Sequence, residues 1–370
     1  MKAKSLTRLG SLTFVGALAL TACGSDNATG TADGGSNSGS GDSSLPSTPL
    51  TGVGASSQQA AITAWESGFS DLGGQVQYSP DGSGAGREAL LAGGAQFAGS
   101  DRALKTEEWE QSKEVCGPEG AINIPVYISP VAVAFNLPGI DSLNLDAETI
   151  AKIFKGEITT WNDEAIASQN DGVDLPDTKI TVVHRSDDSG TTENFTEYLE
   201  AASNGAWDVE ADGNWPSQYA GESNKGTSGV VSTTSSTEGA ITYADASAIG
   251  DLGKVSVKVG DDYVELSADA AAKAVELSER TGGMNENDMA ITVNRTPEDS
   301  SAYPVVLVSY HIVCSGYSSQ DNVDLVKAYE SYVVSSEGQQ AAADAAGSAP
   351  LTATLSSDAK TAIDAIEVTQ

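Results

Sequence analysis

The sequence predicts an α/β fold over residues 50–370, because short apolar strands alternate with helices along this part of the chain. Two longer apolar stretches rich in β-branched residues, 122–135 and 303–313, are interpreted as strands that cross between domains. A chain of 370 residues is long enough for about two domains with ample cores. Ligands of open α/β sheets bind beyond the carboxyl ends of the strands, so we expect the functional site there.

The individual elements are predicted from the spacing of apolar residues, which recurs every three or four residues in helices and alternates or is continuous in strands. After a glycine-rich stretch, the helix-spaced residues Ile62, Trp65 and Phe69 predict the first helix. The elements expected after it are strands at 75–78 and 96–99 around a helix at 87–91, the long strand at 122–135, helices at 145–154 and 161–166, a strand at 180–183, a helix at 189–199, a helix-loop-strand unit at 229–243, a helix at 269–279, the long strand at 303–313, and helices at 322–335 and 337–346.

A polar turn between a strand and a helix is the first candidate for a binding site. The strand at 180–183 is followed by Arg185 and by an Asp-Ser-Gly-Thr turn at 188–191, where the next helix begins. A helix amino terminus has free N–H groups and the positive end of the helix dipole, and therefore binds anions. Arg185 adds a forked, permanently charged donor. The alternative is that Ser189 is only a helix cap and Arg185 forms a surface ion pair.

Two more helices begin with glycine and hydroxyl residues. Ser56 and Ser57 precede the first helix, and Ser56 with Gln59 three residues later matches a capping box. Ser83 lies in a Gly/Ser turn before the helix at 87–91. Each motif alone is typical of ordinary capping, but three of them in one chain favour an anion site if folding brings them together.

In order and spacing these segments resemble the PstS-type phosphate-binding proteins, the extracytoplasmic receptors of phosphate ABC importers. The resemblance extends from about residue 50 to the C-terminus. Its most specific part is the combination of a Lys-Gly…Trp-Asn-Asp motif at 155–163 with an Arg…Asp-x-Ser-Gly-Thr motif at 185–191. The matching segments are 50–56, 81–86, 97–101, 153–166, 185–191 and 239–243.

This resemblance implies a two-lobed periplasmic-binding-protein-like fold of type II, with the ligand in the interlobe cleft and a hinge that closes over it. It assigns residues 50–126 and 303–370 to the first lobe and 127–302 to the second. Asp187 is implied to form a salt bridge that orients Arg185. The implied phosphate-binding residues are Ser56, Ser57, Ser83 and Asp101 from the first lobe, and Arg185, Ser189, Gly190 and Thr191 from the second.

The chain departs from the family pattern at the first helix start. Ser56 stands where the family usually has Thr, which keeps a hydroxyl. Ser57 stands where many members have Phe followed by Pro. The family uses this position mainly through its backbone N–H, so we expect the change to be tolerated, although packing by the Phe side chain is not carried over.

Asp101 is expected to discriminate between oxyanions. Phosphate at neutral pH carries at least one proton, whereas sulfate carries none. An ionised carboxylate only accepts hydrogen bonds. Asp101 can therefore accept the phosphate proton, while sulfate would face it with an unshared lone pair and a like charge. The alternative, taken without the resemblance, is an ordinary turn or capping aspartate.

The first 22 residues have the pattern of a secretory signal peptide. Lys2, Lys4 and Arg8 form a basic start, residues 12–20 are apolar, and the segment ends in small residues. The sequence Leu-Thr-Ala-Cys before Gly24 resembles a bacterial lipobox, which implies cleavage after residue 22 and lipidation of Cys23. Residues 23–49 are rich in Gly, Ser, Thr and Asp and are predicted to be a disordered tether. The protein would then be held outside the cytoplasm, on the cell membrane, only through its lipid.

Cys116 and Cys314 remain after Cys23 is assigned to the lipid. In an exported protein such a pair is expected to form a disulfide. Both residues lie next to the predicted crossing strands, and a bond there would tie the strands close to the hinge.

Charge and histidine content exclude other function classes. The formal net charge is −33, and removal of the acid-free residues 1–22 with their three basic residues leaves 16 basic against 52 acidic residues, or −36. This argues against binding to nucleic acid or to an anionic membrane. His184 and His311 are the only histidines in the sequence, so a multi-histidine metal site is excluded. His311 is expected to be half-buried in a strand, and we expect neither a metal nor a cofactor.

Four functions are compatible with the sequence, and one of them, a phosphate-sensing or adhesion role on the same scaffold, is left open by it. The leading hypothesis is a receptor that binds inorganic phosphate and hands it to the permease subunits of a phosphate ABC importer. A receptor for another oxyanion, such as sulfate or molybdate, is the second, and the carboxylate of Asp101 argues against it. A secreted phosphatase is the third, but such an enzyme normally needs a metal cluster or an activated nucleophile with a base. We therefore expect a binding protein and no catalytic residues.

Overall fold

The computed structural model describes residues 45–282 and 284–369. The predicted signal peptide (1–22), the lipidation site at Cys23 and most of the tether (23–49) lie outside these residues. Within them, no helix is both long and apolar enough to cross a membrane.

Apart from α3 and α11, the helices of the described part lie close to the predicted positions, although α2 begins at Ser83 rather than at residue 87. Asp146, Ser189, Ser267 and Ser319 cap four of them through their side chains. The bounds are α1 (Gln59–Asp71), α2 (Ser83–Leu91), α3 (Thr106–Cys116), α4 (Ala147–Phe154), α5 (Glu164–Ala167), α6 (Gly190–Ala202), α7 (Gly226–Ser236), α8 (Ala268–Glu276), α9 (Gln320–Val333), α10 (Ser336–Ala346) and α11 (Ala353–Asp364), with a 3₁₀ turn at Ala246–Ala248.

Most strands belong to one sheet, whose central order is β2-β1-β3-β13-β4-β8-β6-β7. Strands β9, β10 and β5 extend it beside β4, and two small pairs, β11 with β12 and β14 with β15, lie apart. The bounds are β1 (Leu50–Gly54), β2 (Val76–Ser79), β3 (Phe97–Ser100), β4 (Ala121–Phe135), β5 (Ser142–Leu145), β6 (Thr181–Arg185), β7 (Glu222–Asn224), β8 (Ala240–Asp245), β9 (Gly253–Val259), β10 (Asp262–Val264), β11 (Glu279–Arg280), β12 (Ile291–Thr292), β13 (Val306–Cys314), β14 (Gly316–Tyr317) and β15 (Glu367–Val368).

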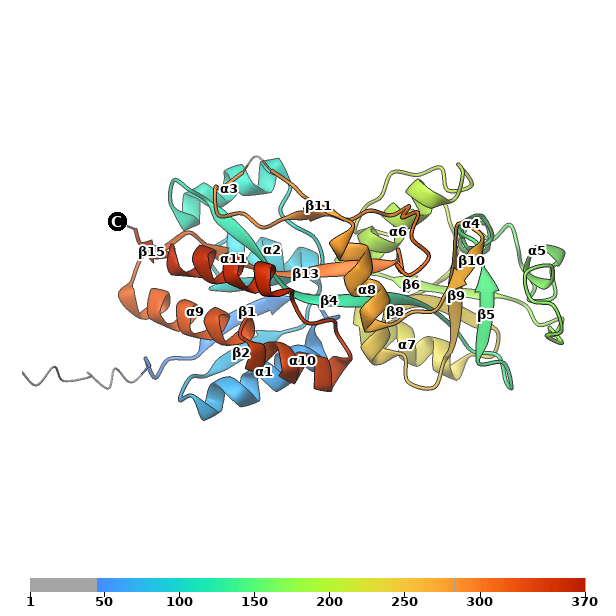
Figure 1. Ribbon diagram of the computed structural model, residues 1–370, viewed down its shortest axis with the longest axis horizontal. Helices are drawn as coiled ribbons and strands as arrows, with labels where there is room; N and C mark the ends of the chain where they lie inside the picture. Colours follow the sequence, from blue (N-terminus) through green and yellow to red (C-terminus); the bar gives the residue numbers. More distant parts are fainter. Residues whose placement is uncertain (1–44, 283, 370) are drawn as a thin grey trace, which may run out of the picture. The chain divides into compact units, whose positions relative to one another are not determined.

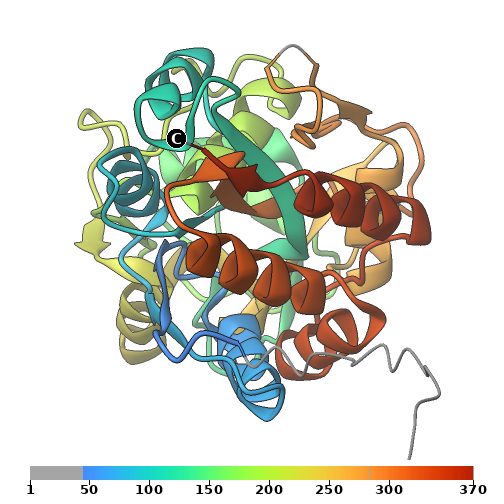
Figure 2. The ribbon, with the colours of Figure 1, turned by 90° about the vertical axis from the view of Figure 1, so that its left-hand side faces the viewer.

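Two lobes share the long strands β4 and β13, which run through the middle of the molecule (Figure 1). β13 pairs with β3 in the first lobe and along β4, and β4 continues beyond Val131 to pair with β8 of the second lobe. Helices α9 and α11 lie across the outer end of the first lobe (Figure 2). All residues of β4 and β13 are buried, which explains their continuous apolar runs.

Both long strands were predicted as crossings, and the alternating α/β pattern of the rest is confirmed. The sequence reasoning missed helices α3 and α11 and strand β9. Helix α3 has only two buried residues, Ser112 and Cys116, so it lacks the apolar stripe by which a helix is recognised.

A stretch inside the predicted second lobe contacts the first lobe. Asp288 accepts hydrogen bonds from the backbone and side-chain nitrogens of Asn123 at 2.9 and 2.7 Å. Arg280 pairs with Asp358 of α11 at 2.9 Å. Residues 279–292 therefore pass back over the first lobe, and the lobe boundaries at 126/127 and 302/303 stay predictions.

His311 is fully buried rather than half-buried as expected. Its Nδ1 lies 2.9 Å from Oε2 of Glu330, which is buried as well, and its ring packs at 4.8 Å from that of Phe97. Because β13 is covered on both faces, alternation of apolar and polar residues does not predict which of its side chains are exposed.

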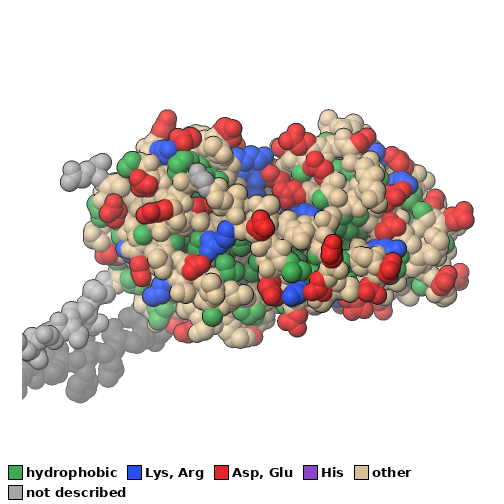
Figure 3. Space-filling view, turned by 45° about the horizontal axis from the view of Figure 1, so that its top comes forward, with side chains coloured by type: hydrophobic (Ala, Val, Ile, Leu, Met, Phe, Trp, Pro, Cys, Tyr) green, Lys and Arg blue, Asp and Glu red, His purple; other side chains and the backbone are tan. Residues whose placement is uncertain are grey.

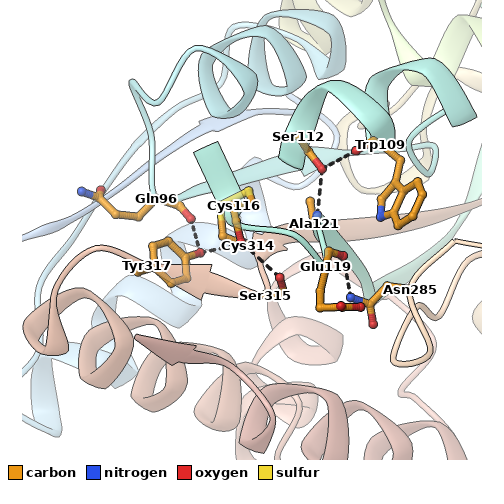
Figure 4. Close-up of a disulfide and its surroundings, with 10 residues drawn as sticks. All are labelled: Gln96, Trp109, Ser112, Cys116, Glu119, Ala121, Asn285, Cys314, Ser315 and Tyr317. Atoms are coloured by element: carbon orange, nitrogen blue, oxygen red, sulfur yellow. Dashed lines mark hydrogen bonds between the residues drawn. A yellow bond between two sulfur atoms is a disulfide. The ribbon is translucent and has the colours of Figure 1, made fainter. Parts of the chain in front are cut away.

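Cys116 and Cys314 are joined by a disulfide (Figure 4), at the end of β13 that pairs with the start of β4. Cys314 pairs with Ala121 at the start of β4, whereas β13 meets Pro130 of β4 through Val306 at its other end. Eight residues of strand separate the two positions, or about 26 Å. The expectation that the bond ties strands close to the hinge is therefore wrong. β13 is long, and the disulfide lies at the end of this strand that is farther from the second lobe.

Thiol titration of the denatured, unreduced mature protein is expected to find no reactive thiol at Cys116 or Cys314. The reason is that their sulfur atoms are joined in a disulfide, which denaturation without reduction does not break. Titration after reduction is the control and should find two more thiols. Two reactive thiols before reduction would contradict the bond.

Candidate functional site

The helix starts that the sequence singled out converge where the two lobes meet. The side-chain oxygen of Ser83, the first residue of α2, accepts a hydrogen bond from the backbone N–H of Asp101 at 3.2 Å. Gly190, the first residue of α6 in the second lobe, lies against both: a Cβ there would be 2.8 Å from Cβ of Asp101 and 2.9 Å from Oγ of Ser83. The amino ends of α2 and α6 therefore face each other across Asp101.

The carboxylate of Asp101 is held by three hydroxyls. Ser57 and Ser309 each donate to Oδ1 at 2.6 Å, and Thr191 donates to Oδ2 at 2.8 Å. Asp101 is only 3% exposed, so these bonds lie in a water-poor environment in which charge-assisted hydrogen bonds are strong. Thr191 reaches Asp101 from the other lobe, so the carboxylate joins the two sides of the cleft.

Ser56 does not form the capping box that its spacing with Gln59 predicts. The cap position of α1 is Gln58, which makes no side-chain capping bond. The hydroxyl of Ser56 instead crosses to the second lobe, where it accepts the backbone N–H of Thr227 at 3.0 Å and shares a hydrogen bond with the Thr227 hydroxyl at 3.0 Å. Thr227 lies in the first turn of α7, so a third helix start borders the cleft.

Arg185 lies at the end of β6, where Asp187 binds its guanidinium with both oxygens, at 2.8 Å from Nε and 2.5 Å from Nη2. Burial raises the pKa of Asp187, but the hydrogen bonds and charge of Arg185 outweigh this effect, so the pKa is lowered overall. A Cβ on Gly82, just before Ser83, would be 2.6 Å from Oδ2 of Asp187. The pair therefore borders the same cleft as the amino end of α2.

The turn at 188–191 caps its helix and also lies beside Asp101 at the cleft. Ser189 caps α6 by accepting the N–H of Thr192 at 3.2 Å, as the plain capping interpretation expects. Gly190 and Thr191 then begin the helix at the cleft, where the helix dipole favours an anion. His184 does not take part: its ring stacks on Trp215 at 5.0 Å and its Nδ1 contacts the carbonyl of Arg185.

Ion pairs join the lobes around the site. Arg87 of α2 contacts Asp188 at 3.2 Å, and Arg102 contacts Glu193 of α6 at 2.7 Å. Glu108 binds Arg102 at 2.6 Å, and although burial opposes it, the hydrogen bond and charge of Arg102 lower the pKa of Glu108 to about 2. Figure 3 shows basic side chains gathered where the two halves meet, with acidic side chains around them. A pocket of about 380 Å³ lies beside them, lined in part by Asp101.

Several residues of this arrangement were missed by sequence reasoning. Thr227 and Ser309 contact predicted site residues, and Asn194 of α6 donates to the backbone carbonyl of Asp101 at 2.6 Å. The sequence contains one indication of Ser309, which is a hydroxyl residue within an otherwise apolar strand. The sequence contains no such indication for Thr227 and Asn194, since threonine and asparagine are common on exposed helices. Among the described residues, no group of three or more His, Cys, Asp or Glu side chains could hold a metal ion.

Replacing Gly190 with alanine is expected to lower phosphate affinity by about tenfold, because overpacking at a tight contact costs roughly 1–3 kcal/mol. The added methyl group would press on Asp101 and Ser83 only when the lobes are closed. Calorimetric titration measures the affinity, and small-angle scattering checks whether the variant still contracts with phosphate. Gly94→Ala is the control, since its nearest contact would be an ordinary 3.4 Å. Equal affinity in Gly190→Ala and the parent would contradict this contact.

Asp245 is a fully buried acid next to the crossing, where it pairs in register with Val131 of β4. Its Oδ1 accepts from the hydroxyl of Tyr127 at 3.1 Å and from the N–H of Ser247 at 2.9 Å, whereas Oδ2 has no partner in the described structure. Burial raises the pKa of Asp245 to about 6, and the negative charge of Asp101 adds to this effect. Folding therefore shifts Asp245 toward its protonated form relative to the unfolded chain.

The free energy of unfolding is expected to decrease as pH rises from 4 to 7, because Asp245 loses the proton that the folded protein holds more tightly than the unfolded chain does. Since the folded pKa lies above that of the unfolded chain, the stabilisation is complete below pH 4 and is lost as pH passes 6, by roughly 1–3 kcal/mol. Urea unfolding at pH 4.5 and 7 should show this loss in the parent and not in Asp245→Asn. The same pH dependence in both would exclude Asp245 as its source.

The chain is similar to known proteins along most of its length. A family model described as the PBP superfamily domain matches residues 25–337. Phosphate-binding protein PstS 3 of Mycobacterium leprae is 36% identical over 325 residues, which cover 86% of this chain and 87% of that protein. Phosphate-binding protein PstS 2 of Mycobacterium tuberculosis is 35% identical over 370 residues, which cover 96% of this chain and 97% of that protein.

Solved structures share the two-lobed fold. A phosphate-binding protein from Stenotrophomonas maltophilia superimposes with a TM-score of 0.67 at 23% identity, covering 85% of this chain and 93% of that one. A putative phosphate ABC transporter substrate-binding protein from Clostridium perfringens, with bound phosphate, gives a TM-score of 0.55 at 18% identity, covering 81% and 98%. The similarity to these solved structures shows the fold, whereas the mycobacterial relatives, at higher sequence identity, show the family. The chain belongs to the PstS-type phosphate-binding proteins of the PBP superfamily.

Proposed function

We propose that this protein binds inorganic phosphate outside the cytoplasm and delivers it to the permease subunits of a phosphate ABC importer. The observation that carries the proposal is the meeting of two helix amino ends, from different lobes, at one buried carboxylate acceptor, Asp101. Helix ends and hydroxyls supply donors to an anion, and the carboxylate supplies an acceptor for its proton. The mycobacterial relatives carry the name phosphate-binding protein, which supports this ligand.

The binding residues in this proposal are those that the sequence singled out. Ser56, Ser57, Ser83 and Asp101 come from the first lobe, and Arg185 from the second, together with Ser189, Gly190 and Thr191 at the start of α6. Asp187 orients Arg185 through the paired contacts at 2.8 and 2.5 Å. No metal or cofactor takes part in the proposed binding. The lobes close over the ligand, and the ion pairs between them, such as Arg102 with Glu193, stabilise the closed form.

In the same proposal, the protein is a lipoprotein. Cleavage after residue 22 leaves Cys23 at the amino terminus, its lipid holds the protein on the outer side of the cell membrane, and the tether allows the lobes to reach the permease. A flexible chain of this length spans roughly 25–30 Å. Cys23→Ser should release the protein from the membrane fraction, and retention there would contradict the anchor.

Calorimetric titration of the phosphate-stripped mature protein with phosphate and then with sulfate tests the proposed ligand. Tight one-to-one binding of phosphate with little sulfate binding is the expected result. Preference for sulfate would indicate another oxyanion receptor and remove the proposed role of Asp101. Binding of neither anion would contradict the function and leave the fold unaffected.

A further inference from the structure

The hydrogen bonds around Asp101 leave one acceptor position on its carboxylate. An ionised carboxylate has about four lone-pair positions, two on each oxygen. Ser57 and Ser309 both donate to Oδ1 at 2.6 Å, which fills that oxygen. Thr191 fills one position on Oδ2 at 2.8 Å. The remaining position is therefore on Oδ2, the oxygen that faces the start of α6.

The direction of the Ser309 hydrogen bond is determined by Gln58. The side-chain nitrogen of Gln58 donates to Oγ of Ser309 at 2.6 Å and to the carbonyl of Tyr310 at 3.2 Å. Because a carbonyl only accepts, the Gln58 atom that faces Tyr310 is the amide nitrogen. Ser309 thus receives a hydrogen from Gln58 and gives its own to Asp101, since its other acceptor, the carbonyl of Ser100, is 3.4 Å away.

The relay joins two segments that lie far apart in the sequence. Ser57 and Gln58 come just before α1, whereas Ser309 lies 251 residues after Gln58. Ser309 comes from the crossing strand β13, at a point where its pairing with β4 shifts register between Ser309 and Tyr310. Such irregularities re-aim side chains beside functional sites. Gln58 and Ser309 are both fully buried, so water does not replace these bonds.

We infer that Ser57 and Ser309, the latter oriented by Gln58, are positioning residues that hold the Asp101 carboxylate turned so that only Oδ2 is open to the ligand. The inference rests on the proposed function and assigns the selectivity of the same site. With two donors on Oδ1 and one on Oδ2, the carboxylate keeps its free acceptor position on Oδ2. A protonated oxyanion such as phosphate can donate to Oδ2, whereas sulfate cannot. The selectivity for a protonated anion thus depends on residues that do not contact it through their hydroxyls.

The test compares phosphate and sulfate affinities in the mature parent protein and in Ser309→Ala by calorimetry. One donor is lost from a buried carboxylate, so phosphate affinity should fall about tenfold and the phosphate-to-sulfate affinity ratio should fall with it. Gln58→Met keeps the side-chain length without the donor and should lower the ratio in the same direction. Ser129→Ala is the matched control, because Ser129 is equally buried on the paired strand β4 and makes no hydrogen bond to Asp101.

The ratio separates positioning from a structural role. A general loss of stability or closure would weaken both anions equally and leave the ratio at the parent value, and this result in Ser309→Ala and Gln58→Met would overturn the inference. If Ser309→Ala does not fold, Gln58→Met alone decides in the same way. Recovery of the ratio in Ser309→Thr, which keeps the hydroxyl, would support it further. The parent measurement reports separately on the proposed function, because a parent that binds no phosphate contradicts that function whatever the variants do.

Discussion

Replacing Arg185 with alanine is expected to lower phosphate affinity roughly 100- to 1,000-fold, since truncating one member of a buried, hydrogen-bonded charge pair costs about 2–5 kcal/mol. Arg185 is 3% exposed, and its guanidinium is held by both oxygens of Asp187. Its loss removes the permanent positive charge at the cleft and leaves Asp187 as a partly buried negative charge next to the ligand. Calorimetric titration with phosphate measures the effect directly.

Two controls separate this effect from general destabilisation. Lys258→Ala removes the same charge from an exposed position on β9 of the second lobe and should leave the affinity unchanged. Arg185→Lys keeps the charge but not the forked geometry, so its affinity should fall between those of the parent and the alanine variant. A phosphate-induced thermal shift in Arg185→Ala equal to that of the parent would remove Arg185 from the binding site.

Replacing Asp101 with asparagine is expected to lower phosphate affinity roughly 10- to 100-fold and to improve sulfate binding relative to phosphate, because a hydrogen bond to a charged group contributes about 1.5–3 kcal/mol. If the amide oxygen keeps the Oδ1 position with Ser57 and Ser309, the amide nitrogen takes the Oδ2 position. A donor then faces the ligand where the parent has an acceptor. Phosphate loses the partner for its proton, and sulfate gains a donor.

Competition titrations with phosphate and sulfate give the ratio that this prediction concerns. Asp188→Asn is the matched control, because Asp188 borders the cleft beside Arg87 but accepts no hydrogen bond from Ser57, Ser309 or Thr191. Its phosphate-to-sulfate ratio should stay near that of the parent. An unchanged ratio in Asp101→Asn would show that the carboxylate does not determine selectivity.

Local sequence patterns predicted those parts of the fold whose physics is local. The continuous apolar runs of β4 and β13 follow from burial on both faces of the strand. The helix-spaced apolar residues of α4 and α6 follow from burial on one face of the helix. The cap of α6 by Ser189, which the sequence offered as the alternative to an anion site, is local as well, since a cap depends on residues within one turn. The Trp161 motif also proved to be packing, because its ring is buried against Phe135 and its N–H binds the carbonyl of Gly239 at 3.0 Å.

Patterns that depend on distant partners were misread or missed. Ser56 has the spacing of a capping box, yet its hydroxyl binds Thr227, which is 171 residues away. The disulfide lies far from the crossing into the second lobe, because β13 extends about 26 Å between its two ends. His311 was expected to be half-exposed, and the cover on the second face of β13 buries it.

By itself, the sequence determined the α/β class, the two crossing strands and the acidic charge, because these depend on composition and short-range periodicity. Only the tertiary structure decided how the residues of the candidate site are arranged. It brought Ser57, Thr191 and Ser309 from three distant segments to one carboxylate and placed Gln58 behind them. The physical reason is that a hydrogen bond between remote residues requires only that folding bring donor and acceptor within about 3 Å, and no local spacing records that condition.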